Sequence, residues 1–181
     1  MFKQYFHALK DLLDTVEKDE KDSIQKAAQM ISSCIQEDGI VHVFGCGHSH
    51  LLAEELFYRA GGLAPISPIL IEDLMLHKGA VRSSQLEKDD DFAEVVMANM
   101  TIQPKVGDTL MEHPSLDVPF GSGSTVIGTA IVNGIMVETI NIMVDKGINP
   151  PVLKSGNVDG AEEHNRRLVT HYKGRIPMLE D

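Results

Sequence analysis

Residues 40–62 read IVHVFGCGHSHLLAEELFYRAGG, and this stretch decides the fold. Its first five residues are apolar or β-branched in the main and are followed at once by glycine, as in a buried strand. Glycines at 45 and 47 then turn the chain, and LLAEELFYRA supplies good helix formers with no breaker before Gly61. The stretch therefore predicts a strand, a tight loop and a helix, and APISPILI (64–71) predicts a second strand.

Two amphipathic helices are predicted before the first strand. Apolar residues recur at helical spacing over 2–16 and again over 24–35, on either side of a charged break. We expect residues 1–38 to be helices that pack on the rest of the chain or on a second copy. We expect residues 39–181 to form one α/β domain.

The second half of the chain has clearer signals at its end than at its start. Residues 72–87 have a poor pattern and are interpreted as a functional loop with some helix, and the acidic start of DDDFAEVVMANM (89–100) favours a helix. Weak strand signals, TLM and LDV, follow. A long helix is predicted from GSGST (121–125) to about Lys146, and a last helix over AEEHNRRLVTHY (161–172).

Composition limits the classes of function. The 181 residues are 43% apolar and 24% charged, with a formal net charge of −11. This length suits one packed domain, and the negative charge argues against broad binding to nucleic acid or to anionic membranes. Cys34 and Cys46 lack zinc-type or redox-type spacing, and the apolar run 126–144 is interrupted by polar residues. We therefore expect a cytoplasmic protein without a signal peptide or a membrane span.

The loop after the first strand is suited to an anion, because free backbone amides converge where a strand feeds a helix through glycines. A G-x-G turn alone is weak evidence, since any tight turn favours glycine. The dinucleotide fingerprint needs a third glycine where His50 stands, although Glu72 could act as its ribose-binding acid. The phosphate-loop string G-x-x-x-x-G-K-[ST] does not occur, which excludes that class.

Four segments together resemble the SIS (sugar isomerase) domain family. They are FGCGHSHLLAEELFYRAGGLAPI (44–66), LMLHKGAVRSSQLE (74–87), GSGSTVIG (121–128) and PPVLKSGNVDGAEEHN (150–165). The match is most specific for a group of bacterial SIS-domain proteins taken as sugar-phosphate isomerases. The resemblance implies a doubly wound α/β fold, with a five-stranded parallel sheet between helices, that binds a phosphorylated sugar.

The resemblance breaks near residues 105–106. The family's Ser/Thr-rich phosphate loop of the S-x-S-G type is not found in the sequence. About two βα units, of roughly 30 residues each, are absent where the family keeps its central strands. We expect either a deletion or an omitted segment at this point.

Candidate binding residues come from the loop and from the resemblance. Ser49 stands where the family places a hydroxyl on the sugar or its phosphate, although it could equally cap the helix. The serines of the third segment resemble the family's last ligand-side loop, and the C-terminal cluster resembles segments that reach a neighbouring subunit's site; capping and solvation are the structural alternatives. The predicted substrate-binding residues are Gly45, Gly47, His48, Ser49, His50, Ser83, Ser84, Ser124, Thr125, Lys154 and His164.

Candidate catalytic residues are Glu54, Glu55 and His77. His50 and Glu54 share a helix face, and the resemblance to heptose-phosphate isomerases implies proton transfer and a metal site for such a pair. Zinc is therefore considered, although the family's late-helix histidine is replaced and Glu138 aligns there. His77 stands where aminosugar-phosphate isomerases keep a ring-opening histidine, and a neutral imidazole can move a proton in that way.

The sequence favours a protein that binds a phosphorylated sugar and isomerises it between aldose and ketose forms. No redox cofactor is expected, and the partners are a small-molecule sugar phosphate and a second copy of the chain in a homodimer or larger oligomer. The alternative is a non-catalytic sugar-phosphate sensor. A nucleotide-binding module rests only on Gly45, Gly47 and Glu72.

Overall fold

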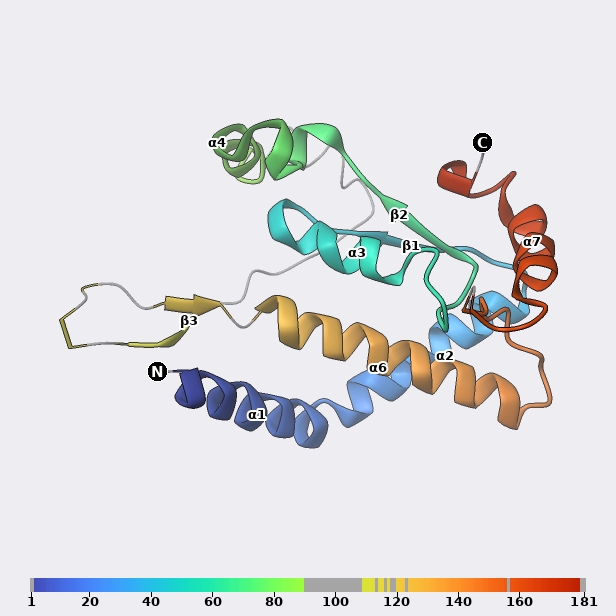
Figure 1. Cartoon of the computed structure of the whole chain (residues 1–181), viewed down its shortest axis with the longest axis horizontal. Coiled ribbons are helices and arrows are strands. Elements are labelled where there is room, and N and C mark those ends of the chain that lie inside the picture. Colours follow the sequence, from blue (N-terminus) through green and yellow to red (C-terminus); the bar gives the residue numbers. More distant parts are fainter. Residues whose placement is uncertain are drawn as a thin grey trace.

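The structure is a computed structural model that describes residues 2–89, 109–112, 114–115, 117, 120–122, 124–155 and 157–179. Figure 1 shows its elements in chain order, with the labelled N- and C-terminal ends at opposite ends of the molecule. The elements are α1 (Phe2–Asp19), α2 (Lys21–Gln36), β1 (Val41–Phe44), the 3-10 turn η1 (Gly47–Ser49), α3 (His50–Leu56), β2 (Ile66–Ile69), the 3-10 turn η2 (Glu72–Leu74), α4 (Leu76–Leu86), β3 (Thr109–Met111), β4 (Phe120–Ser122), α6 (Ser124–Asp145), α7 (Ala161–Tyr172) and the 3-10 turn η3 (Pro177–Leu179).

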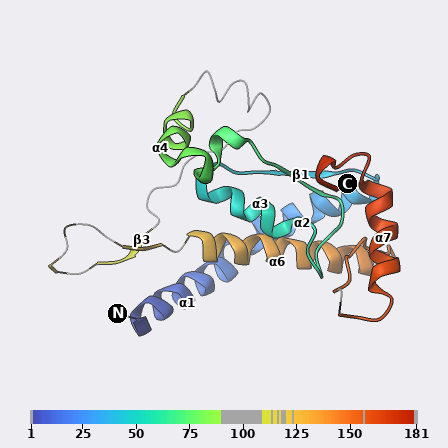
Figure 2. The same cartoon turned by 45° about the horizontal axis from the view of Figure 1, so that its top comes forward.

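Strands β1 and β2 form a parallel pair in which Val41 lies opposite Ile66 and Phe44 opposite Ile69. Helices α2 and α3 both contact β1, and α6 packs against α2 and α3 (Figure 2). The expected α/β fold, with helices flanking parallel strands, is confirmed. Within the described residues the parallel sheet has these two strands, whereas the resemblance implies five; β3 and β4 form a separate antiparallel pair.

Some predicted boundaries differ from the structure. The third helix was expected to continue to Ala60, but it ends at Leu56, because Phe57 is extended and Tyr58 adopts a left-handed φ of 45°. The expected loop over 72–87 is mostly helix α4, interrupted at Gly79, whose φ is 144°. The predicted helix over 89–100, most of the LDV segment and the break at 105–106 lie outside the described residues.

The core is centred where α6 crosses α2. Ala28, Ser32 and Thr139 are fully buried at this crossing, and these small side chains let the two helix backbones approach closely. The Thr139 hydroxyl donates to the Ile135 carbonyl of its own helix at 2.8 Å, so its burial leaves no unpaired donor. The main apolar cluster beside the crossing consists of Ile35, Leu56, Leu63, Ile66, Met136 and Met143.

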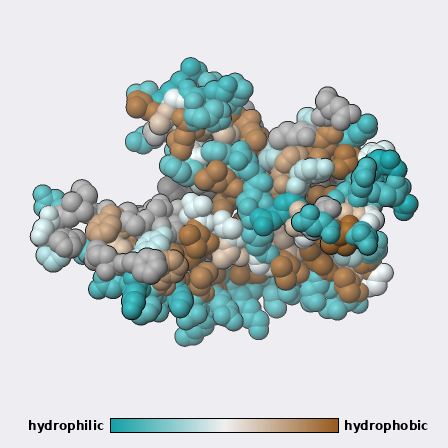
Figure 3. All heavy atoms as spheres, in the orientation of Figure 1, coloured by the Kyte–Doolittle hydropathy of each residue, from teal (hydrophilic) through white to brown (hydrophobic). Residues whose placement is uncertain are grey.

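Helix α6 is apolar on nearly every side. By length and composition alone, Thr125–Asp145 could cross a membrane; in the structure it packs against α1, α2 and α3. Only 22% of its apolar window is buried, and Val126, Val137 and Val144 are exposed. Figure 3 shows apolar surface in the middle of the face drawn there, over the region of α6.

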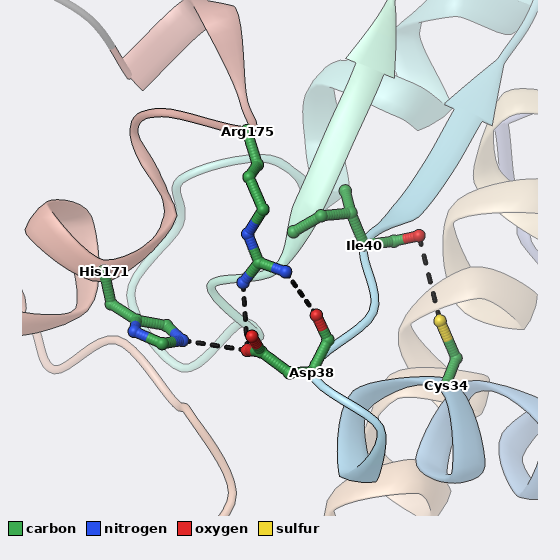
Figure 4. Close-up of polar contacts among 5 residues, drawn as sticks. All are labelled: Cys34, Asp38, Ile40, His171 and Arg175. Atoms are coloured by element: carbon green, nitrogen blue, oxygen red, sulfur yellow. Dashed lines mark hydrogen bonds and ion pairs between the residues drawn. The ribbon is translucent and has the colours of Figure 1, made fainter.

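The C-terminal region is fastened to the end of α2 through Asp38 (Figure 4). His171 Nε2 and Arg175 Nη2 each lie 2.9 Å from Asp38 Oδ1, and Arg175 Nη1 donates to the Asp38 carbonyl. The Arg175 guanidinium also lies over the ring of Tyr172, 5.4 Å from its centroid. The hydrogen bond from His171 and then that from Arg175 hold the pKa of the Asp38 carboxyl below its ordinary value of 3.8.

We predict that Asp38→Asn lowers the melting temperature at neutral pH by a small amount, on the order of 1–3 °C, as expected for a solvated ion pair. Asparagine tolerates the left-handed φ of 58° at this position, so the variant removes the charge and keeps the backbone conformation of the turn. Because the folded-state pKa is lowered, the contribution to stability is present above the ordinary value and is lost as the pH falls through the folded-state pKa.

The measurement is a series of thermal melts of both proteins from pH 7 downward. The difference between their melting temperatures should narrow once the pH falls below 3.8, the ordinary value for this carboxyl. A difference that stays constant across this range would contradict the assignment.

Candidate functional site

The loop after β1 keeps its shape because two of its residues are glycines, for different reasons. A Cβ at Gly45 would lie 2.5 Å from both the carbonyl carbon and the carbonyl oxygen of Ser49, so the backbone crosses itself too closely for a side chain. Gly47 has a φ of +50°, in the left-handed region that favours glycine. The sequence therefore needs both glycines to bring η1 back over the end of β1.

His50 is buried and holds the loop from inside. Its Nδ1 hydrogen-bonds to the Gly47 carbonyl, which assigns the ring proton to that nitrogen because a carbonyl only accepts. Its Nε2 lies 3.9 Å from Glu54 Oε1, beyond hydrogen-bond distance. In this structure His50 is a support of the loop, and its predicted contact with a substrate stays a prediction.

His48 and Ser49 are exposed at the outside of the same turn. Ser49 occupies the N-cap position of α3, as expected, but it has helical backbone angles and its side chain makes no capping hydrogen bond. Its hydroxyl is consequently available to a ligand. Donors of this kind, next to a backbone turn, suit an anionic or hydroxylated ligand.

The two glutamates predicted as catalytic point to different partners. Glu54 is half-exposed beside His50. Glu55 Oε1 accepts a hydrogen bond from the Arg59 guanidinium and one from Asn133 Nδ2 at 3.3 Å, which ties α3 to α6. A cavity of about 110 Å³ lies beside this link, between residues 59–62 and α6, and is separate from the Gly45–Gly47 turn.

Helix α4 lies against η1 at the carboxyl ends of the parallel strands, where open α/β sheets bind their ligands. Ser83 is fully buried and its hydroxyl donates to the Leu74 carbonyl at 2.9 Å, so it anchors the helix rather than facing solvent. His77 is exposed on the first turn of α4. The side chain of Ser84 lies outside the described residues.

Sequence reasoning missed Glu87, the residue that follows α4. A Cβ at Gly47 would lie 2.7 Å from Glu87 Oε1, so this carboxylate rests directly against the turn. Burial, and after it the charge of Glu87, raises the pKa of the neighbouring Cys46 thiol. The one sequence signal for Glu87 is that it is the last residue of the LMLHKGAVRSSQLE segment, which resembles the family. Its proximity to Gly47 depends on how α4 packs, which the sequence pattern does not give.

The predicted residues of the second half are distributed over two other places. Thr125 is exposed at the start of α6, and the side chain of Ser124 lies outside the described residues. Asn165 binds both the backbone N–H and the carbonyl of Lys154 at 2.8 Å, and His164 Nε2 donates to the Val152 carbonyl at 2.8 Å. His164 therefore holds the chain's own backbone, while the Lys154 side chain is exposed.

The zinc site considered from the sequence has two candidate ligands here, His50 and Glu54. In the part of the chain that the structure describes, no three His, Cys, Asp or Glu side chains gather as a metal ion would require.

The family model for the SIS domain matches residues 4–113, more than half of the chain. The chain belongs to the SIS-domain family. It is 39% identical to a UPF0309 protein of Geobacillus kaustophilus, covering 99% of this chain and 97% of that protein. It is also 33% identical to a UPF0309 protein of Listeria innocua, covering 99% and 98%, and 30% identical to one of Thermoanaerobacter pseudethanolicus, covering 99% and 100%.

The alignment of this SIS-domain chain with the Geobacillus kaustophilus protein also shows a difference in length. It runs over 243 positions, whereas the chain has 181 residues, so at least 62 positions of the relative face a gap. Since nearly all of both chains is aligned, the extra residues of the relative lie within the alignment.

We predict that Gly45→Ala destabilises the SIS domain by about 2 kcal/mol or more. The new methyl group would clash with backbone atoms of Ser49, which cannot move away as a flexible side chain can. Gly134→Ala is the matched control. A Cβ at Gly134 meets nothing within 4 Å in the middle of α6, so alanine should stabilise that helix by up to about 1 kcal/mol.

Urea denaturation of the wild type and both variants measures these changes. The opposite signs of the two effects exclude a general response to glycine replacement. A Gly45→Ala protein as stable as the wild type would show that the turn does not need this close approach.

Proposed function

We propose that the protein binds a phosphorylated sugar at the Gly45–His50 turn and isomerises it between aldose and ketose forms. The observation that carries the proposal is the Ser49 hydroxyl, which is exposed and has no hydrogen-bond partner among the described residues, on a glycine turn at the carboxyl end of β1 in a chain of the SIS-domain family. A chain with a net charge of −11 must hold an anion by local donors, and the turn offers the exposed Ser49 hydroxyl and His48 imidazole.

Isomerisation needs an open-chain sugar and a carrier for one proton. In the proposal His77 moves a proton from a sugar hydroxyl to the ring oxygen, which opens the ring. A carboxylate then moves a proton between C1 and C2 through an enediol, and Glu54 and Glu55 are the carboxylates that the sequence suggests. The net reaction neither oxidises nor reduces the sugar, so it requires no redox cofactor.

A non-catalytic sugar-phosphate sensor is the second candidate. It is favoured by Gly62, which stands where the aminosugar-phosphate isomerases that this chain resembles carry a glutamate base. It is also favoured by the engagement of Glu55 with Arg59 and Asn133 rather than with the turn. In both candidates the ligand is the same, and they differ in whether the bound sugar is converted.

The proposal also covers the location of the protein, its partners, its oligomeric state and the internal deletion. We infer a cytoplasmic protein without nucleic-acid or membrane partners, which the acidic composition supports. A homodimer or larger oligomer is supported by the exposed valines of α6, because such apolar surface favours association. The length difference from the relatives supports an internal deletion, which we place near residues 105–106.

We predict that a hexose, heptose or aminosugar phosphate raises the melting temperature of the wild-type chain. At 100 times its dissociation constant a ligand adds about 2.7 kcal/mol, which corresponds to several degrees for a domain of this size. Ser49→Ala should weaken the affinity roughly tenfold through the loss of one hydrogen bond to an anion.

Ser33→Ala, which removes an exposed hydroxyl on α2, is the control and should leave the affinity unchanged. Stabilisation by NAD and by none of the sugar phosphates would sink the proposal and favour the nucleotide-binding alternative.

A further inference from the structure

We propose that Glu87, rather than Glu54 or Glu55, is the carboxylate that moves the proton between C1 and C2 of the bound sugar. This inference rests on the proposed function, because it assigns a role within the same site. It starts from the contact between the Glu87 carboxylate and Gly47, which joins the end of α4 to the turn after β1.

The Glu87 carboxylate lies against the same glycine that His50 contacts. Glu87 Oε1 would lie 2.7 Å from a Cβ placed on Gly47, and the His50 ring hydrogen-bonds to the carbonyl of the same glycine. One glycine is therefore in contact with a carboxylate and an imidazole that come from different elements. A base must reach the proton that it abstracts, and Glu87 is the carboxylate found against the turn itself.

The other two glutamates have partners or positions away from the Gly45–Gly47 backbone. Glu55 accepts hydrogen bonds from Arg59 and Asn133, so it serves the contact of α3 with α6. Glu54 is directed to the Nε2 side of His50, 3.9 Å away, and is half-exposed. Neither contact brings a carboxylate oxygen onto the Gly45–Gly47 backbone.

The backbone of Glu87 is held in place, whereas its carboxylate is exposed. Its backbone N–H donates to the Ser83 carbonyl at 3.0 Å, and Ser83 is anchored in turn by its hydroxyl on Leu74. Ser83 is thus a positioning residue for Glu87. The Glu87 carboxylate itself makes no hydrogen bond or ion pair within the described residues, and it is exposed, so a substrate can reach it.

The negative charge of Glu87 determines which end of the sugar phosphate faces it. A carboxylate repels a phosphate placed against it, so in this proposal the phosphate binds at the exposed His48 and Ser49 side of the turn and is directed away from Gly47 and Glu87. Carbons C1 and C2 of a sugar phosphorylated at its last carbon are at the opposite end from the phosphate. They consequently face Glu87 when the phosphate is directed away from it.

The proposed step conserves atoms and electrons. The Glu87 carboxylate takes the proton from C2 of the open-chain aldose, while the C1 carbonyl oxygen takes a proton from water, and an enediol forms. The Glu87 carboxyl then returns its proton to C1 as the hydroxyl on C2 gives its proton to the hydroxide left from that water and becomes the ketone. Glu87 ends as a carboxylate and the water proton is restored.

The test follows solvent deuterium entering the sugar. Wild-type protein and variants are incubated in D₂O with fructose 6-phosphate, sedoheptulose 7-phosphate and glucosamine 6-phosphate, and the C1 and C2 protons are followed by NMR. We expect the wild type to exchange a proton of at least one of these probes. Glu87→Gln should slow the exchange by about 10²–10⁴-fold, as loss of an acid–base group does.

Matched variants separate the catalytic role from a structural one. Glu87→Asp keeps the carboxylate but withdraws it, so it should retain more exchange than Glu87→Gln. Glu54→Gln should lose less than about tenfold, which is well below the effect of removing a general base. Glu162→Gln, on the exposed first turn of α7, should leave the rate unchanged. The ligand-induced rise in melting temperature should be the same in Glu87→Gln as in the wild type.

The outcomes distinguish this inference from the proposed function. A wild type that exchanges, together with a Glu87→Gln protein that exchanges as fast, overturns the role of Glu87 alone. A wild type that binds a sugar phosphate but exchanges nothing overturns it in favour of the sensor. A wild type that neither binds nor exchanges any of the probes overturns both.

Discussion

The packing of α6 across α2 is the constraint on which the other elements depend. Ala28, Ser32 and Thr139 are small enough to bring the two helix backbones together, and all three are fully buried. Once these helices are fixed, the apolar side chains of α6 complete a single cluster with α3 and β2. The turn after β1 is therefore held from both sides: by the strand that precedes it, and by a helix that rests on α6.

The site makes use of an arrangement that is common to parallel α/β proteins. Because β1 and β2 run in the same direction, the segments that follow them, η1 and α4, meet at one edge of the sheet. This is why Glu87 and Gly47, 40 residues apart in the numbering, come into contact. A ligand at this edge meets the exposed His48 and Ser49 of the turn and, against Gly47, the Glu87 carboxylate, which has no partner among the described residues.

Much of the fold could be predicted from the sequence, because helical periodicity and β-branched runs are local signals. They located α1, α2, β1, β2, α6 and α7 to within a few residues. The end of α3 could not be predicted, since Tyr58 adopts a left-handed conformation that its residue type does not suggest. The turn was recognised from Gly45 and Gly47, but Glu87 reaches it only through the tertiary contact of α4, which no spacing rule encodes.

The fastening of Asp38 to the C-terminal region has a consequence for synthesis on the ribosome. Asp38 is made 133 residues before His171, its partner. At roughly 5–20 residues per second, the His171 imidazole and the Arg175 guanidinium are synthesised on the order of ten seconds after Asp38. During that interval the nascent N-terminal half has the contacts among its own elements, such as the pairing of β1 with β2, and its contacts with α6 and α7 form once those helices have emerged.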